Sequence, residues 1–182
     1  MIEEKYQKLC KTPSDINEHL PTLKRYAEQS ESIVEMGVRG IVSTWALLAA
    51  KPKILVSIDI EDPSAFGGDI WEVYDAANAA NINFSFIKGS SLEVTIPEVD
   101  MLFLDTLHFK DQLSKELERH HEKVKKFIAM HDSNKEEFEG MNQAIGEFLE
   151  KHPEWAVAER FENNHGMCFL KRFRCPLNGG RD

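Results

Sequence analysis

Cysteine is scarce in this chain, and its three copies form no recognisable pattern. Only Cys10, Cys168 and Cys175 occur among 182 residues, with no CxxC pair and an odd total. A disulfide framework needs an even set of cysteines and a cysteine-based zinc site needs close pairs, so the sequence suggests neither. We therefore expect a reducing, cytoplasmic setting.

Long apolar runs and clusters of basic residues are also lacking. No stretch approaches the roughly 18 apolar residues of a membrane span, and the start, MIEEKYQKLC, has no apolar stretch behind basic residues. Lys and Arg number 22 against 31 Asp and Glu, which gives a formal charge of -9. Because phosphate binding needs clustered cations, we expect neither a nucleic-acid nor a membrane partner, and a small-molecule substrate instead.

The sequence does contain a regular alternation of strand-like and helix-like segments. With 42% hydrophobic residues, the chain can build one sizeable core. The last two strand-like segments flank a turn, which forces the final strand to run antiparallel. The pattern predicts an α/β fold with a Rossmann-like, seven-stranded, mostly parallel sheet, a reversed last strand and helices on both faces. The expected strands are 32–35, 53–60, 83–88, 99–104, 124–130, 155–161 and 167–173, and the expected helices are 43–50, 70–80, 112–123 and 141–151.

The chain divides into three regions. Residues 1–30 are polar and helical in pattern, and Pro21 divides them into two pieces. This preface either packs on an edge of the sheet or covers a ligand as a lid. Residues 31–174 form the main domain, and residues 175–182 form a loose tail.

One strand, turn, helix and strand unit carries the strongest functional signal. It runs from Ser32 to Asp59 as SIVEMGVRGIVSTWALLAAKPKILVSID. Gly37 and Gly40 do not fit the dinucleotide fingerprint GxGxxG, which argues against a pyrophosphate cradle. Glycines still let the backbone approach a ligand, a helix N-terminus offers free N–H groups, and Asp59 can accept hydrogen bonds from ribose hydroxyls. The unit therefore predicts a nucleoside-binding site.

Four acids fall at or just past the ends of expected strands: Glu35, Asp59, Asp105 and Asp132. In an open parallel sheet, ligands bind outside the carboxyl ends of the strands, where the strand order reverses. If the strands that end in Asp105 and Asp132 are neighbours, a spacing of about 4.8 Å brings the two carboxylates together. Two like charges there repel unless a cation lies between them, and oxygen ligands suit Mg²⁺ best.

The segment Glu35-Met-Gly37-Val-Arg-Gly40-Ile-Val-Ser43-Thr44 resembles motif I of the class I S-adenosylmethionine-dependent methyltransferases, E/D-x-G-x-x-x-G. The second glycine of the motif falls on Ile41, one place after Gly40. The resemblance implies S-adenosylmethionine as the cofactor. It places Glu35, Gly37 and Ser43 at the methionine part with Gly40 in the same loop, Asp59 at the ribose, and Ser90 or Ser91 at the adenine edge.

The stretch MLFLDTLHFKDQLSKELERHHEKVKKFIAMHDS is similar to the metal-assisted O-methyltransferases, a group that includes catechol, macrolide-sugar and cephalosporin-pathway enzymes. The resemblance implies that Asp105 and Asp132 are metal ligands. It also implies that His108 is a general base, and an ordinary imidazole pKa of roughly 6.5 suits that role. His131 stands where an acid is common, so either it is a ligand of a softer ion, Mn²⁺ or Fe²⁺, or it is no ligand.

The function implied is O-methylation of a small hydroxylated molecule, a sugar or a secondary metabolite. The ion would bind a substrate hydroxyl at Asp105 while His108 takes its proton. A non-catalytic nucleoside-binding module and another reaction of the same cofactor, hydrolysis or hydroxylation, stay open. So does a homo-oligomer, because little of the chain is left to cover the cleft. We expect His120 and His121, in a charged helix, to be solvated.

Overall fold

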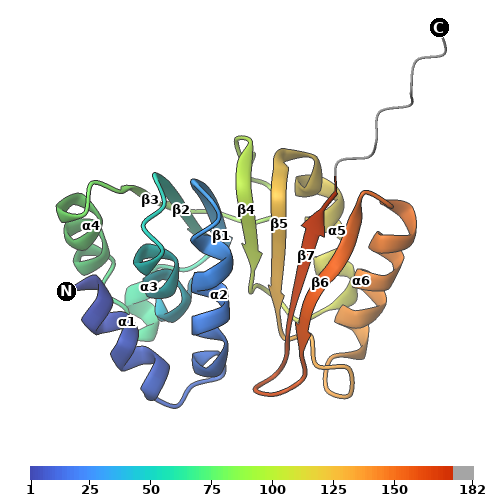
Figure 1. The fold of residues 1–182 in the computed structure, drawn as a ribbon, viewed down its shortest axis with the longest axis horizontal. Helices are drawn as coiled ribbons and strands as arrows, with labels where there is room; N and C mark the ends of the chain where they lie inside the picture. Colours follow the sequence, from blue (N-terminus) through green and yellow to red (C-terminus); the bar gives the residue numbers. More distant parts are fainter. Residues whose placement is uncertain (174–182) are drawn as a thin grey trace, which may run out of the picture.

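The computed structural model describes residues 1–173, so the tail expected at 175–182 lies outside the described residues. Seven strands form one sheet in the order β3-β2-β1-β4-β5-β7-β6 (Figure 1). All neighbouring strands are parallel except β7, which runs antiparallel to both β5 and β6. The predicted fold class is confirmed. The strands are β1 (Ser32–Met36), β2 (Ile54–Asp59), β3 (Asn83–Lys88), β4 (Val99–Leu104), β5 (Val124–His131), β6 (Trp155–Phe161) and β7 (Met167–Arg172).

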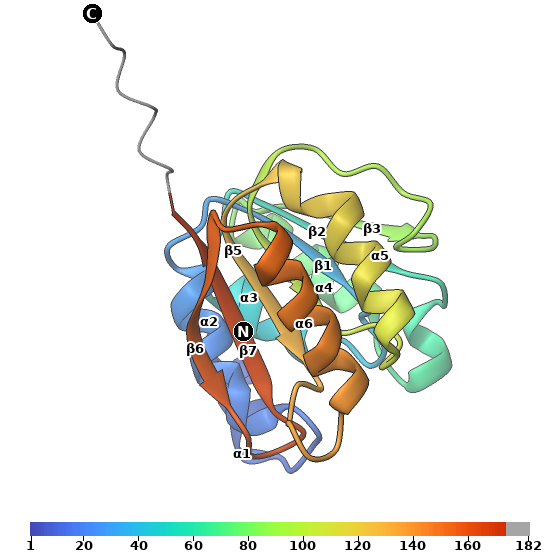
Figure 2. The same ribbon diagram turned by 90° about the vertical axis from the view of Figure 1, so that its right-hand side faces the viewer.

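Helices cover both faces of the sheet, which Figure 2 shows almost edge-on. Helices α1 to α4 share one apolar cluster with one face, whereas α5 and α6 share a second cluster with the other face. The helices are α1 (Ile2–Lys11), α2 (Leu20–Ala27), α3 (Val42–Ala49), α4 (Ile70–Ala79), α5 (Lys110–His120) and α6 (Glu139–Lys151), with 3-10 turns η1 (Asn17–His19), η2 (Pro63–Phe66) and η3 (His121–Lys123).

The strand order reverses at the middle of the sheet, between β1 and β4. Strand β1 pairs with β2 on one side and with β4 on the other, both in parallel. Both central strands are buried on their two faces, as expected for strands between two helical layers. The carboxyl ends of β1 and β4 therefore border the crevice in which this kind of sheet binds ligands.

The N-terminal preface covers a face of the sheet and does not pack on its edge. Helices α1 and α2 both pack on α3. The Tyr26 ring of α2 stacks on Phe169 at 4.1 Å between centroids and meets Phe127 edge-on at 5.1 Å, so α2 lies over β5 and β7. The preface does consist of two helices, but the break between them lies at residues 12–19, before Pro21, which occupies the first turn of α2, where its missing N–H costs nothing.

The two histidines at the end of α5 are buried, so the expectation that they are solvated was wrong. His120 donates from Nε2 to the carbonyl oxygen of Ser91 at 2.7 Å, and the His121 ring packs edge-on against Phe148 of α6. Helix α5 packs along α6, which encloses this end of the helix. Among residues 1–173, no helix is long and apolar enough to cross a membrane.

Candidate active site

The turn after β1 lies against the end of β4, and a glycine makes this contact possible. Gly37 has a φ of 85°, in the left-handed region. A Cβ at this position would lie 1.9 Å from the carbonyl oxygen of Asp105, so only glycine fits. The N–H of Asp105 also donates to the Met36 carbonyl at 2.8 Å. The turn predicted to hold the cofactor is thus joined to a predicted metal ligand.

The next glycine of the turn is under no such constraint. A Cβ at Gly40 would meet only the carbonyl oxygen of Phe66, at 3.6 Å. Positive φ values fall instead on Arg39, at 46°, and on Ile41, at 61°, directly before α3 begins. Left-handed backbone favours glycine, and Ile41 is where motif I has its second glycine. The loop thus has a β-branched residue at the position whose conformation suits glycine.

Glu35 lies beneath this loop and is completely buried. Its carboxylate accepts hydrogen bonds from the hydroxyl groups of Ser43 and Thr44 at the start of α3, and from Ser57 of β2. Burial raises the pKa of Glu35 to about 7, although the three hydroxyl donors act in the opposite direction. Glu35 therefore fastens α3 to β1 and β2 from below, which fixes the loop that α3 follows.

Asp59 fixes the same loop from the side. Its Oδ2 accepts the backbone N–H groups of Val38 and Arg39 at 2.7 and 2.9 Å, and its Oδ1 accepts the N–H of Glu61 at 2.9 Å. Each carboxylate oxygen has two lone-pair positions, so Asp59 retains capacity for a ligand. The acid predicted to bind a ribose thus also shapes the loop beside that ribose.

A hollow of about 310 Å³ opens between this loop and the ends of β2, β3 and β4. Apolar side chains supply much of its wall, including Ile60, Phe66 and Leu107, which are otherwise exposed. An apolar pocket with few polar groups is typical of a small-molecule site. The predicted cofactor residues that line it are Gly37, Asp59, Ser90 and Ser91, with Asp105 at its inner end.

Behind the wall of this first hollow lies a buried acid that the sequence did not mark. Oε1 of Glu116 on α5 accepts hydrogen bonds from Ser91, Thr106 and Gln112, the last at 2.8 Å. Burial raises the pKa of Glu116, against the effect of these donors. Ser91, Thr106 and Gln112 all line the hollow, so Glu116 fixes the positions of three polar side chains in its wall.

A second hollow of about 350 Å³ adjoins the first and shares Arg39, Asp105 and Thr106 with it. Its wall also contains Gly40 and Ser43 from the loop and helix after β1. The remaining polar lining comes from Asp15 in the N-terminal preface, His108 after β4, and Asp132 after β5.

Two acids and two histidines come together at the second hollow. Nδ1 of His131 lies 3.3 Å from Oδ1 of Asp105 and 3.1 Å from Oδ2 of Asp132. Nε2 of His108 lies 2.6 Å from the same Asp132 oxygen. Strands β4 and β5 are neighbours, as the predicted metal site required. The structure thus brings together Asp105, His108, His131 and Asp132, whose roles remain predictions.

The hydrogen bonds of His131 determine where its protons lie. Nε2 faces the backbone carbonyl of Asp15 at 3.0 Å, and because a carbonyl only accepts, Nε2 carries a proton. Burial lowers the pKa of His131, but Nδ1 hydrogen bonds to Asp105 and Asp132 outweigh burial and raise it to about 10. The ring is therefore an imidazolium at neutral pH, and it balances the two carboxylates.

The contacts that Asp132 makes with His108 and His131 also shift the pKa values of Asp132 and His108. Burial acts to raise the pKa of Asp132, but hydrogen bonds from His108 and His131 outweigh it and lower this pKa. The pKa of His108 is raised, chiefly by its hydrogen bond with Asp132 and against partial burial. Asp132 is therefore ionised at neutral pH, and His108 releases its proton only above the usual range of an imidazole.

These residues fit a divalent metal ion. One ligand atom from each of Asp105, His131 and Asp132 lies within 4.8 Å of the others. The Nε2 proton of His131 is held by a backbone carbonyl, which aims Nδ1 at the carboxylates. Metal-ligating histidines are oriented in the same way. A bound ion would take the position of the Nδ1 proton, so the donor set would be two carboxylates and one imidazole.

Comparisons with known proteins agree on the fold. A putative caffeoyl-CoA O-methyltransferase from Staphylococcus aureus superposes with a TM-score of 0.66 at 14% identity, over 94% of this chain and 91% of that one. An O-methyltransferase from Bacillus cereus in complex with SAH gives 0.65 at 14% identity, over 94% and 90%. A putative RNA methyltransferase from Pyrococcus horikoshii gives 0.62 at 10% identity, over 87% and 86%.

The chain therefore has the fold of the class I S-adenosylmethionine-dependent methyltransferases, as the resemblance in its sequence implied. No protein-family model matches the sequence, and no curated protein matches it significantly. The solved structures that are similar to this chain include O-methyltransferases and a putative RNA methyltransferase.

Sequence reasoning missed several residues of the site. Asp15 contributes a backbone carbonyl to His131 and its side chain to an ion pair with Arg39, at 2.9 Å, beside the second hollow. A backbone carbonyl leaves no signal in a sequence. Gln112 and Glu116, by contrast, are four residues apart on α5 and so share one helix face, which could have been recognised.

Proposed function

We propose that this protein is a methyltransferase that transfers the methyl group of S-adenosylmethionine to a hydroxyl oxygen of a small molecule, with the help of a divalent ion. One observation carries the proposal. Asp105 is the member of the acid and histidine cluster that lines both hollows, so the cluster borders the apolar nucleoside-sized pocket at this residue. A methyl donor in the first hollow and an acceptor in the second would meet there.

The first hollow suits the nucleoside part of the cofactor. Oδ1 of Asp59 retains a position for a ribose hydroxyl, and the groups held by Glu116 offer hydrogen bonds to an adenine edge. The sulfonium methyl group that S-adenosylmethionine supplies is already electrophilic, so the protein has only to align an acceptor oxygen and assist the loss of its proton.

The second hollow supplies the proton acceptor. His108 is half exposed and lies on the wall of this hollow, within reach of a bound hydroxyl group. Asp105, His131 and Asp132 would hold the ion, which lowers the pKa of a bound hydroxyl and stabilises the alkoxide. Because the contact with Asp132 raises the pKa of His108, the transfer rate should rise with pH through a value above 6.5.

The acceptor proposed is a small molecule rather than a nucleic acid. The second hollow measures about 350 Å³, which suits a sugar or a single aromatic ring. The chain carries a formal charge of -9, which disfavours a phosphate backbone.

The proposal is tested by Asp105→Asn, with Asp111→Asn on the exposed start of α5 as the matched control. Transfer from labelled S-adenosylmethionine would be measured against a panel of sugars, catechols and other phenols, with Mg²⁺ or Mn²⁺. We expect Asp105→Asn to lose at least about a hundredfold in transfer while cofactor affinity changes only a few-fold. The control should keep full activity.

Two outcomes would contradict the proposal in different ways. Full activity of Asp105→Asn would refute the role of the acid cluster. Tight cofactor binding with no product from any acceptor in the panel would favour a nucleoside-binding module of the same fold.

A further inference from the structure

A second group of potential metal ligands lies at the opposite edge of the sheet from the two hollows. Helix α5 begins just past the end of β4 and ends just before β5 begins, so its C-terminus lies at the amino-terminal edge of the strands. Helix α6 runs alongside α5 and also ends there. Glu118 near the end of α5, His121 directly after it, and His152 directly after α6 form the group.

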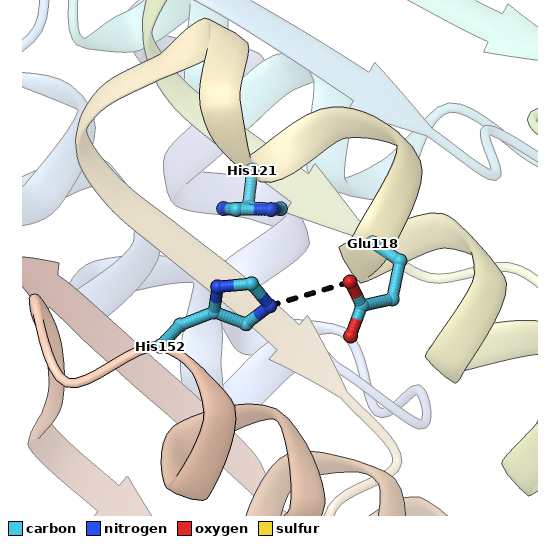
Figure 3. Close-up of side chains that lie close together, drawn as sticks. All are labelled: Glu118, His121 and His152. Carbon is cyan, nitrogen blue, oxygen red and sulfur yellow. Dashed lines mark hydrogen bonds and ion pairs between the residues drawn. The ribbon is translucent and has the colours of Figure 1, made fainter.

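The three side chains converge, as Figure 3 shows. Nε2 of His152 lies 3.3 Å from Oε2 of Glu118, and the His121 and His152 rings lie 4.0 Å apart between centroids. One ligand atom from each residue lies within 4.8 Å of the other two. Two imidazoles and a carboxylate are therefore close enough to bind a single ion after small side-chain movements.

The ring of His121 is the member of this group with an unpaired nitrogen among the described residues. The residue is 6% exposed, and its Nδ1 is buried with no hydrogen-bond partner among residues 1–173. A buried polar atom without a partner is costly unless something binds it. Burial also lowers the pKa of His121, so its ring is neutral at pH 7 and offers lone pairs, the form in which histidine binds metals.

The surroundings of the group favour a cation. The C-terminal ends of α5 and α6, where helix dipoles are negative, both lie at this position. A second acid, Glu154, lies 3.9 Å from Nδ1 of His152, on the opposite side of the ring from Glu118. Nζ of Lys151 lies 3.5 Å from Oε1 of Glu118 in a largely exposed contact, and Nη2 of Arg172 lies 3.9 Å from Oε1 of Glu154. An ion could therefore displace Lys151 at little cost.

We propose that Glu118, His121 and His152 form a site for a divalent transition-metal ion of the zinc type, which fastens the C-terminal ends of α5 and α6 to each other. Zinc accepts two imidazoles and a carboxylate, with water in the fourth position of a tetrahedron. Mg²⁺, which prefers oxygen ligands, is a poor match for this donor set. The site is separate from Asp105 and does not depend on the proposed methyl transfer.

The test is a calorimetric titration of the purified, chelator-treated protein with Zn²⁺. It is made in the Asp105→Asn background, so that the other cluster contributes little. Long-range ¹H–¹⁵N spectra of the imidazole rings would be recorded at each step. We expect one ion per chain with a Kd below about 100 μM, and ¹⁵N shifts of the two rings assigned by His121→Asn and His152→Gln. Saturating Zn²⁺ should raise Tm by several degrees.

The matched variants are Glu118→Gln and His152→Gln, with Glu150→Gln on the exposed side of α6 as the control. Glu118 is half exposed, so its substitution should leave the fold intact. Each of the two ligand variants should weaken Zn²⁺ binding at least about tenfold, and the control should not. A Kd weaker than about 100 μM, or binding that both ligand variants leave unchanged, would overturn the proposal.

Discussion

The buried carboxyl group of Glu35 makes a quantitative prediction about pH and stability. The pKa of Glu35 is raised from 4.5 to about 7, so the folded chain holds this proton more tightly than the unfolded chain does. The stability that comes from the neutral form is therefore present below about pH 4.5 and is lost as the pH rises through about 7. At 1.36 kcal/mol per pKa unit, the full cost of ionising Glu35 is about 3 kcal/mol, and most of it falls between pH 5 and 8.

The substitution Glu35→Gln removes this titration and keeps a side chain that can hydrogen-bond Ser43, Thr44 and Ser57. Urea unfolding at pH 5, 6.5 and 8 would compare it with the original chain and with Glu31→Gln, a substitution of an exposed acid before β1. We expect the free energy of unfolding of Glu35→Gln to gain about 2–3 kcal/mol relative to the original chain between pH 5 and 8. A difference that does not change with pH would refute this account of Glu35.

Three further predictions concern backbone contacts and proton release. Gly37→Ala should lower the free energy of unfolding by at least about 2 kcal/mol and abolish S-adenosylmethionine binding, because its Cβ would collide with the Asp105 carbonyl. Gly40→Ala, its control, should change the free energy of unfolding by less than about 1 kcal/mol. Similar midpoints of urea unfolding for the two variants would contradict this prediction. Gly146→Ala, inside α6 with open space at its Cβ, should raise the free energy of unfolding by about 0.5–1 kcal/mol, and a loss would count against the helix. Binding of Mn²⁺ at pH 8 should release about one proton from His131. The heat of binding, measured by calorimetry, should therefore depend on the ionisation enthalpy of the buffer, and His131→Asn should remove this dependence.

The fold could be predicted because its strands have simple signals. The segment VDMLFL at 99–104 is apolar on both faces apart from Asp100 near its start and is followed by an acid, and β4 occupies those residues. Asp69, directly before α4, is a typical cap residue, and its carboxylate accepts the N–H groups of Trp71 and Glu72. The helix expected at 112–123 begins earlier, at Lys110, and ends in a 3-10 turn from His121.

The site could be predicted only in part, because many of its contacts join distant parts of the chain. The positions of Asp105 and Asp132 followed from strand ends alone. The contact of His131 with the Asp15 backbone spans 116 residues and involves no side chain of the preface, so no residue pattern encodes it. The burial of His121 could have been inferred, since it continues the stripe of Leu113 and Leu117 on the apolar face of α5.

The central claim is that the first hollow binds S-adenosylmethionine, and calorimetric titration of the purified chain with this cofactor and with S-adenosylhomocysteine tests it most directly. We predict one molecule bound per chain with a Kd in the micromolar range, with and without Mg²⁺, and at least about tenfold weaker binding in Asp59→Asn. If neither ligand binds at millimolar concentration, the hollow beside Asp59 does not hold this cofactor and the proposed methyl transfer is wrong.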